Sequence, residues 1–191
     1  MPPTPLPPWP VAPPAHGGIL LREVVDSDLD MVRELATDPY IAQTGTLPAD
    51  ATEQHARGWI AQQRGRHGEG AGFSFTMADA ATGAAVGHCG LWTAELGAGR
   101  ATAGYVVAPS ARGRGFAADA LIALTVFGAT VPGLFRIGLY IEPWNAPSIR
   151  TAERAGYDRE GLLRSYHRIG DRRRDMLLYG RVLHGGSGAR P

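Results

Sequence analysis

Two spacings of apolar residues alternate along the chain and together predict a mixed α+β domain. Runs rich in branched and aromatic residues, bounded by glycine, proline or aspartate, predict strands. These runs cover residues 19–25, 73–79, 85–95, 101–109 and 134–141, followed by a hairpin over 158–183. Apolar residues three or four positions apart predict helices over 26–35, 52–66, 117–127 and 145–156. The order β α α β β β α β α β β contains one central strand, helix, strand crossover, so the predicted fold class is α+β.

The proline-rich start of the chain, "MPPTPLPPWPVAPPAHGG", does not share these patterns. It lacks a charged beginning followed by an apolar core, so it does not resemble a secretory signal. We expect residues 1–17 to form a flexible arm, residues 18–184 to form the domain, and residues 185–191 to form a flexible tail. An alternative hypothesis is that the arm forms an extended polyproline helix that docks into an aromatic groove of a partner.

Composition narrows the class of protein. The chain has 191 residues, 44% of them apolar, and no apolar run of the roughly 18 residues that a membrane span needs. We therefore expect a cytoplasmic protein without a membrane partner. The formal net charge of +1 gives no reason to expect nucleic acid. A single cysteine, Cys89, excludes an internal disulfide framework and a multi-cysteine metal site, and no metal site is predicted.

The stretch "YVVAPSARGRGFAADAL" holds the strongest functional signal. A strand ends there in a glycine-spaced turn that opens a helix, which exposes backbone N–H groups at the positive end of the helix dipole. Gly113 and Gly115 permit backbone angles that a side chain would block, and Arg112 and Arg114 add positive charge. The turn therefore predicts a site for phosphate or pyrophosphate.

Two nucleotide-binding folds compete for the same residues. "GRGFAA" formally satisfies the dinucleotide fingerprint, with Glu142 near the distance expected for its ribose-binding acid. A doubly wound fold needs further strand and helix units, however, and only one helix and a hairpin follow Glu142. A nucleotide triphosphatase loop is disfavoured because the chain contains no lysine.

The same stretch resembles the coenzyme A-binding segment of the GNAT superfamily of N-acetyltransferases. That segment has Arg or Gln, two residues, Gly, one residue, then Gly or Ala, which Arg112, Gly115 and Ala117 match. "YIEPWNAPSIRTAERAGYDREGLLR", "AVGHCGLW" and "RRRDMLLYGRVL" resemble the RimJ/RimL-like branch of ribosomal-protein N-terminal acetyltransferases. The resemblance covers roughly residues 19–183 and implies a GNAT fold, with a mixed, mostly antiparallel sheet whose strands splay around the acetyl-CoA site.

The resemblance implies a set of residues that bind acetyl-CoA as co-substrate. The pyrophosphate would lie on the backbone amides of Arg112, Gly113, Arg114, Gly115, Phe116 and Ala117. Val106 and Val107 match the strand whose backbone binds the pantetheine arm, and the Val107 amide is the candidate donor to the thioester oxygen. Asn145 would contact the pantetheine or hold the strands apart, with helix capping as the structural alternative.

The resemblance also implies direct acetyl transfer to a primary amine, which needs no covalent enzyme intermediate and no role for Cys89. Ser148 matches the position of a general acid for the leaving thiolate. The two positions where relatives carry an acidic base hold Thr102 and Tyr140 instead. Glu142, His88 and Asp175 remain candidate bases, although water alone can deprotonate an amine whose pKa is about 8.

The sequence leaves the amine acceptor open. The branch favours a protein or peptide N-terminal α-amine, whereas similar chains acetylate antibiotics, polyamines and amino acids. The segment 38–50, the helix from Thr52 and the C-terminal hairpin are expected to shape the acceptor site, with Tyr40, Trp92, Trp144 and Tyr166 as candidate lining residues. A rival hypothesis is a catalytically silent acetyl-CoA sensor, suggested by the missing acids. Relatives include monomers and dimers, so a homodimer is also open.

Overall fold

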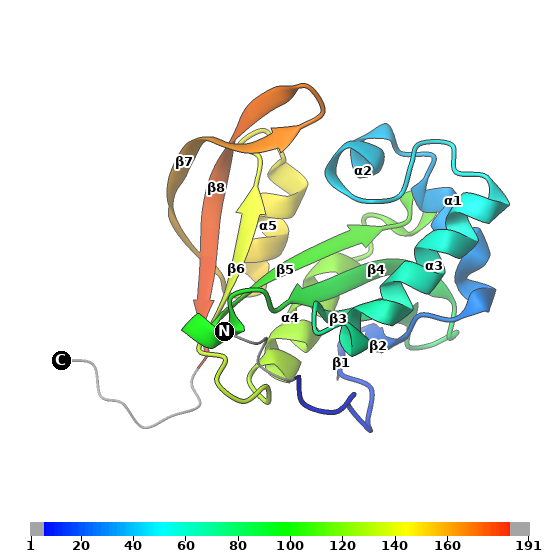
Figure 1. Cartoon of the computed structure of the whole chain (residues 1–191), viewed down its shortest axis with the longest axis horizontal. Coiled ribbons are helices and arrows are strands. Elements are labelled where there is room, and N and C mark those ends of the chain that lie inside the picture. Colours follow the sequence, from blue (N-terminus) through cyan, green and yellow to red (C-terminus); the bar gives the residue numbers. More distant parts are fainter. Residues whose placement is uncertain (1–5, 184–191) are drawn as a thin grey trace.

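The computed structural model describes residues 6–183, and its centre is one eight-stranded sheet with the order β1-β2-β3-β4-β5-β6-β8-β7 (Figure 1). All neighbouring strands are antiparallel except β5 and β6, which are parallel. The strands are β1 (Ala15–His16), β2 (Ile19–Glu23), β3 (Gly72–Asp79), β4 (Ala85–Trp92), β5 (Arg100–Val107), β6 (Arg136–Ile141), β7 (Asp158–Ile169) and β8 (Arg172–Val182). The predicted mixed, mostly antiparallel sheet is thus confirmed.

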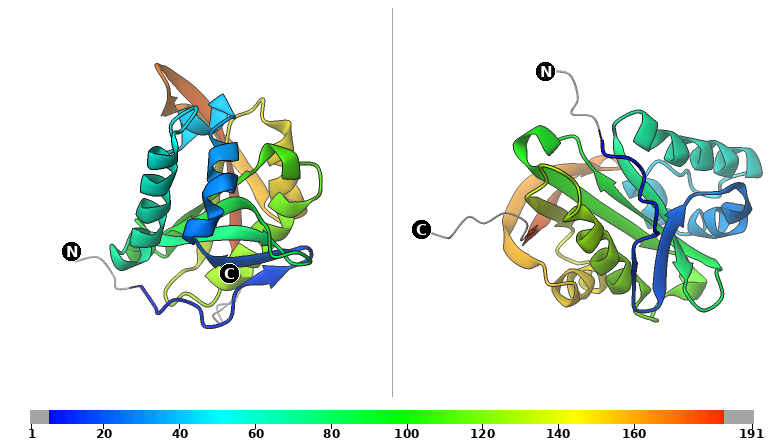
Figure 2. Two further views of the ribbon diagram at one scale, coloured as in Figure 1. Left: turned by 90° about the vertical axis from the view of Figure 1, so that its right-hand side faces the viewer. Right: turned by 90° about the horizontal axis from the view of Figure 1, so that it is seen from below.

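Helices cover both faces of this sheet (Figure 2). They are α1 (Leu29–Leu35), α2 (Pro39–Thr44), α3 (Glu53–Gly68), α4 (Phe116–Gly128) and α5 (Ala146–Arg154). Side chains alternate between the faces along β3. Ser74 contacts Gln63 of α3 on one face, whereas Phe73 and Phe75 pack against Phe127 of α4 on the other.

Two elements lie where no regular structure was predicted. Helix α2 occupies part of the segment 38–50, where Asp38 caps it through a hydrogen bond from the Tyr40 amide (2.9 Å) and Pro39 takes its first position. Six residues are too few to show helical periodicity in the sequence. Strand β1 is only two residues long and pairs with β2.

The described part of the predicted arm packs against the domain. The Trp9 ring lies 4.7 Å from the Phe75 ring and 5.9 Å from the Phe73 ring, measured between centroids. His67, at the end of α3, forms a 2.9 Å hydrogen bond with the Pro7 carbonyl oxygen. The division at residues 17 and 18 stays a prediction, and these contacts argue against a freely moving arm. Residues 1–5 and the predicted tail 185–191 lie outside the described residues.

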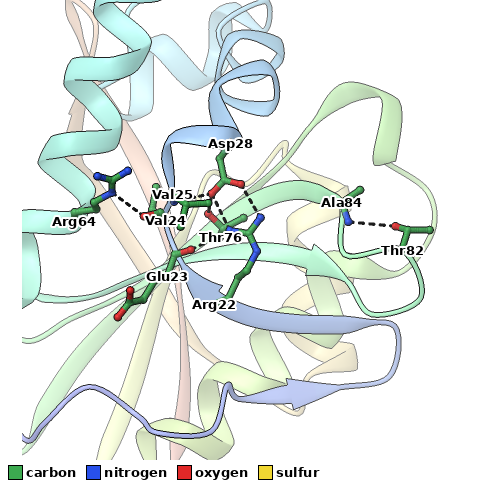
Figure 3. Close-up of polar contacts among 9 residues, drawn as sticks. All are labelled: Arg22, Glu23, Val24, Val25, Asp28, Arg64, Thr76, Thr82 and Ala84. Atoms are coloured by element: carbon green, nitrogen blue, oxygen red, sulfur yellow. Dashed lines mark hydrogen bonds and ion pairs between the residues drawn. The ribbon is translucent and has the colours of Figure 1, made fainter.

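A buried carboxylate joins β2, β3 and the start of α1 (Figure 3). Asp28 is 1% exposed and accepts hydrogen bonds from the Arg22 guanidinium (2.6 and 2.9 Å), the Val25 amide (3.0 Å) and the Thr76 hydroxyl (2.7 Å). Burial alone would raise the pKa of Asp28, but these hydrogen bonds outweigh it and hold the pKa below its usual value. The hydrogen bonds of this buried carboxylate therefore stabilise the turn from β2 into α1.

The sheet divides in its middle. Strands β5 and β6 pair over only three residues, Arg100 to Thr102 with Arg136 to Gly138. Strand β5 continues beside β4 as far as Val107, whereas β6 continues beside β8 as far as Ile141. The two halves of the sheet consequently diverge beyond Thr102, as Figure 1 shows for β5 and β6.

Candidate active site

The divergence of β5 from β6 leaves backbone groups of β5 without a strand partner. The Ala108 amide donates to the Val86 carbonyl (2.9 Å), and Val107 is the register partner of Gly87. Backbone groups of an antiparallel strand point alternately to its two sides. The Val107 N–H therefore points away from β4 and into the opening between β5 and β6. Sequence reasoning had selected this amide as the donor to the thioester oxygen.

The turn after β5 has the backbone geometry that an anion site requires. Gly113 and Gly115 have φ angles of +79° and +84°, which lie in the left-handed region. Gly115 is the N-cap of α4, and its carbonyl accepts from the amides of Ala118 (3.1 Å) and Asp119 (3.2 Å). Within residues 6–183, no hydrogen bond occupies the backbone amides of 113–117. These donors at a helix N-terminus suit a pyrophosphate.

The arginine side chains of the turn form ion pairs with carboxylates from other parts of the chain. The Arg112 guanidinium forms an ion pair with Asp38 (2.6 Å) and donates to the Val107 carbonyl (3.1 Å). Arg114 pairs with Asp79 (3.0 Å) and lies over the Phe116 ring. A guanidinium that the sequence analysis did not select lies beside the turn instead. Arg154 of α5 has its Nη1 atom 3.4 Å from the point where a Cβ of residue 115 would lie.

A cavity of about 550 Å³ connects the opening with the helices α2 and α3. Tyr40 to Leu47 contribute several lining residues from α2 and the following turn, and Trp59, Gln63 and Arg66 contribute from α3. The hairpin of β7 and β8 contributes His167, Ile169 and Met176. Residues of β4, β5 and β6 form the floor of the cavity. They include Thr102 and Tyr140, which occupy the two positions where relatives carry an acidic base. The three elements expected to shape the acceptor site thus surround one cavity.

Asn145 and Ser148 line the same cavity at the start of α5. The Asn145 side-chain oxygen accepts a hydrogen bond from the Ser148 amide (3.2 Å), which caps α5. The Tyr105 hydroxyl donates to the Ser148 carbonyl (3.2 Å) and ties α5 to β5. Asn145 therefore caps α5, which was the structural alternative for this residue. Because it also lines the cavity, it can still contact pantetheine.

Glu142 is buried behind a tyrosine. Its side chain is 3% exposed and accepts a 2.8 Å hydrogen bond from the Tyr40 hydroxyl, while Arg174 lies 3.7 Å away. Tyr40 lines the cavity and Glu142 does not. Burial and the Glu142 carboxylate raise the pKa of Tyr40, so this hydroxyl stays protonated at neutral pH. The Tyr40 hydroxyl therefore connects Glu142 with the cavity.

His88 belongs to a buried hydrogen-bonded chain on the α3 side of the sheet. Gln63 Oε1 accepts from Arg66 Nε (2.9 Å) and from the Ser74 hydroxyl (3.1 Å). Because Ser74 donates its only proton to Gln63, it accepts from Nε2 of His88 at 2.7 Å. Nδ1 of His88 then carries the lone pair. Burial, followed by the charge of Arg66, lowers the pKa of His88 to about 3, so this ring is neutral at physiological pH.

The candidate residues Asp175, Trp144 and Tyr166 lie outside the cavity, as does Cys89, for which no role was predicted. Cys89 is fully buried, and burial raises the pKa of its thiol. Asp175 is exposed and accepts from the Ser165 amide (2.8 Å). Trp144 packs against Tyr40, and Tyr166 stacks on Tyr140, so both support lining residues without lining the cavity themselves.

Several lining residues escaped the sequence analysis. Trp59, Gln63 and Arg66 lie on a helix of weak amphipathicity, and their spacing of three or four residues was the available signal. Trp92, which was named as a candidate lining residue, does line the cavity and lies flat over β4 and β5, because Gly90 and Gly104 leave room for its ring. Arg66 covers that ring, with its guanidinium carbon 4.8 Å from the centroid.

Comparisons with known proteins agree with this geometry. The sequence profile of the acetyltransferase (GNAT) domain matches residues 19–158. The uncharacterized N-acetyltransferase p20 of Bacillus licheniformis is 29% identical over 161 residues, which cover 84% of this chain and 90% of p20. The structure of Mycobacterium smegmatis RimJ with a CoA disulfide has a TM-score of 0.74 and 26% identity, covering 97% of this chain and 89% of RimJ. RimL, an alpha-N-protein acetyltransferase in complex with coenzyme A, has a TM-score of 0.77 and 18% identity, covering 91% and 98%.

The fold and the site define an acyltransferase, and the chain belongs to the GNAT acetyltransferase family. The predicted family and its RimJ/RimL-like branch are confirmed. Acetyl-CoA is the co-substrate of this class, and the open amides of the turn and of Val107 fit its pyrophosphate and thioester. No helix within the described residues is long and apolar enough to cross a membrane. Between Leu6 and Leu183, no group of three or more His, Cys, Asp or Glu residues is arranged to hold a metal ion.

Proposed function

We propose that the protein transfers the acetyl group of acetyl-CoA directly to a primary amine, with the α-amine of a peptide or protein as the leading acceptor. One observation supports this most strongly. The cavity between α2, α3 and the C-terminal hairpin is lined by residues of β5 as far as Val106, and the open amides of residues 113–117 lie in the turn that follows this strand. Coenzyme and acceptor can therefore approach the same strand, β5, from opposite sides of the sheet.

The chain's own groups supply the steps of the transfer. The Val107 N–H donates to the carbonyl oxygen of the thioester as negative charge develops on it. The amine nitrogen attacks the carbonyl carbon, the carbon–sulfur bond breaks, and the Ser148 hydroxyl passes its proton to the leaving thiolate while it takes up a proton from water. The Tyr40 hydroxyl can accept the amine proton as it passes its own proton to Glu142, and water is the alternative acceptor of the amine proton.

The proposal is tested by calorimetric titration with acetyl-CoA and CoA, followed by thiol release with peptides and small amines. Binding together with release in the presence of an amine is the expected result. Binding without release from any amine would contradict the proposal and favour the acetyl-CoA sensor. Absence of binding would show that the turn at residues 112–117 does not hold the coenzyme.

A further inference from the structure

The described lining of the proposed acceptor cavity lacks negatively charged side chains. It contains no Asp or Glu, and its titratable members are tyrosines, two histidines and Arg66. The nearest carboxylate behind the wall, Glu142, is already engaged by Tyr40 and Arg174. A polyamine or a lysine-rich acceptor would thus place its extra positive charges in a cavity without a counter-charge.

Arg66 is held so that its charge faces this cavity. Its Nε donates to Gln63, whose oxygen is also bound by Ser74, and the guanidinium lies over the Trp92 ring. Within residues 6–183, no carboxylate oxygen lies within salt-bridge distance of Arg66. Aromatic stacking and a buried amide fix the side chain while two of its nitrogens remain available to an anionic group.

The hairpin of β7 and β8 adds positive charge at the rim of the same cavity. Its end carries five exposed arginines, Arg164, Arg168, Arg172, Arg173 and Arg174, and two aspartates, Asp171 and Asp175. Figure 1 shows this end of the hairpin rising beside α2.

The register divides these arginines between two faces. Arg172 pairs with Ile169 and Arg174 with His167, and both partners line the cavity. Directly paired residues share a face of the sheet, so Arg172 and Arg174 lie on the cavity side. Arg168 and Arg173 pair with each other and lie on the opposite face. Arg174 forms an ion pair with Glu142, whereas Arg172, on the same face, has no ion-pair partner within residues 6–183.

We infer that the acceptor is the α-amine of a peptide whose following residues are acidic. Arg66 binds a carboxylate close to the amine, and Arg172 binds one farther along the peptide, outside the cavity. Only an acceptor that extends beyond the cavity can contact both groups, which favours a peptide over a free amino acid. This inference rests on the proposed function, because it specifies the acceptor of the same site.

The inference is tested with peptides that differ only in the charge after the first residue. Ala-Asp-Asp-Ala, Ala-Asn-Asn-Ala and Ala-Lys-Lys-Ala are compared with free alanine, alanine amide and spermidine at equal ionic strength. We expect kcat/KM for the Asp peptide to exceed that for the Asn peptide by about tenfold and that for the Lys peptide by more, as charge-assisted hydrogen bonds imply. The preference should shrink as salt is added.

Matched variants assign the preference to the two arginines. Arg66→Gln and Arg172→Gln should each lower, several-fold, the ratio of kcat/KM for the Asp peptide to that for the Asn peptide. Arg173→Gln, on the opposite face of the hairpin, should preserve the preference, and Arg66→Lys should restore part of it. Thermal unfolding of each variant shows whether it remains folded.

The outcomes separate the inference from the proposed function. Equal rates for all three peptides, or a preference for free alanine or spermidine, would overturn the inference and leave the acetyltransferase in place. An Asp preference that survives in both Arg66→Gln and Arg172→Gln would overturn it as well. Acetyl-CoA binding without transfer to any of these amines would instead refute the proposed function, and the inference with it.

Discussion

At the scale of single residues, the clearest stabilising group is the carboxylate of Asp28. It is withdrawn almost completely from water and depends on Arg22, Val25 and Thr76 for its hydrogen bonds. A buried carboxylate that loses its hydrogen-bond partners destabilises the folded state. Removing the carboxylate destabilises it as well, because its partners are then left without a hydrogen bond.

We predict that Asp28→Asn lowers the free energy of unfolding by roughly 3 kcal/mol at pH 7. The folded pKa of Asp28 lies below the ordinary value of about 4, so its stabilisation is complete above that value. The stabilisation is lost as the pH falls through the lower folded pKa. Urea denaturation at pH 7 and at pH 3 should show the difference between wild type and variant shrinking in acid. Asp30→Asn, an exposed position on α1, is the control and should have little effect.

We also predict that Glu142→Gln lowers kcat/KM by less than about tenfold for an α-amine acceptor. Glutamine preserves a hydrogen bond to Tyr40, and an amine with a pKa of about 8 needs little help to lose its proton. Steady-state kinetics with Tyr40→Phe as the companion variant should show a similarly small effect. A loss of several orders of magnitude in Glu142→Gln would identify an essential base.

At the scale of elements, the helix α5 brings a charge to the turn that precedes α4. Arg154 lies beside Gly115, where the open amides would hold a pyrophosphate. Arg112 and Arg114 are partly neutralised by Asp38 and Asp79. Arg154 is therefore the guanidinium best placed to add charge to this anion site.

We predict that Arg154→Gln weakens acetyl-CoA binding by about tenfold, consistent with the loss of one charge-assisted contact to phosphate. Calorimetric titration gives the dissociation constant, and the loss should shrink as the salt concentration rises. Arg159→Gln, at an exposed position of the edge strand β7, should leave binding unchanged. Equal weakening by both variants would indicate a general electrostatic effect and contradict a specific role for Arg154.

A comparison of the predicted with the observed elements shows which features can be predicted from the sequence. Strands and helices with sustained periodicity were predicted, including the strand, turn and helix around Gly113 and Gly115, because local spacing determines them. The short helix α2 was missed, since six residues give no periodic signal. The ion pair of Arg112 with Asp38 and the hydrogen bond from Tyr40 to Glu142 could not be predicted either. They join residues 74 and 102 positions apart, and only the folded sheet brings those residues together.

At the scale of the whole molecule, the proline-rich arm covers a part of β3 that β2 leaves unpaired. Strand β2 pairs with Phe75 to Asp79, so Gly72 to Ser74 extend beyond its end. Trp9 packs over Phe73 in this part and over the adjacent Phe75, which pairs with Glu23 at the end of β2, and His67 contacts Pro7. We propose that residues 6–16 belong to the folded domain.

We predict that Trp9→Ala lowers the free energy of unfolding by about 2 kcal/mol, as removal of a partly buried aromatic ring implies. Chemical denaturation measures this change, and deletion of residues 1–16 should lower the stability further. Deletion of residues 1–5 is the matched control, because it preserves every described contact of the arm. Unchanged stability after deletion of residues 1–16 would identify a flexible leader.

The position of Trp9 also has a consequence for the order in which the chain acquires its contacts during synthesis. The ribosome releases Trp9 early, but its aromatic partners come from β3, and those partners pack in turn on Phe127 of α4. More than 100 residues must therefore emerge before the site for the tryptophan is complete, and domains generally fold as units during translation. The first part of the chain to be made should be among the last to reach its native place.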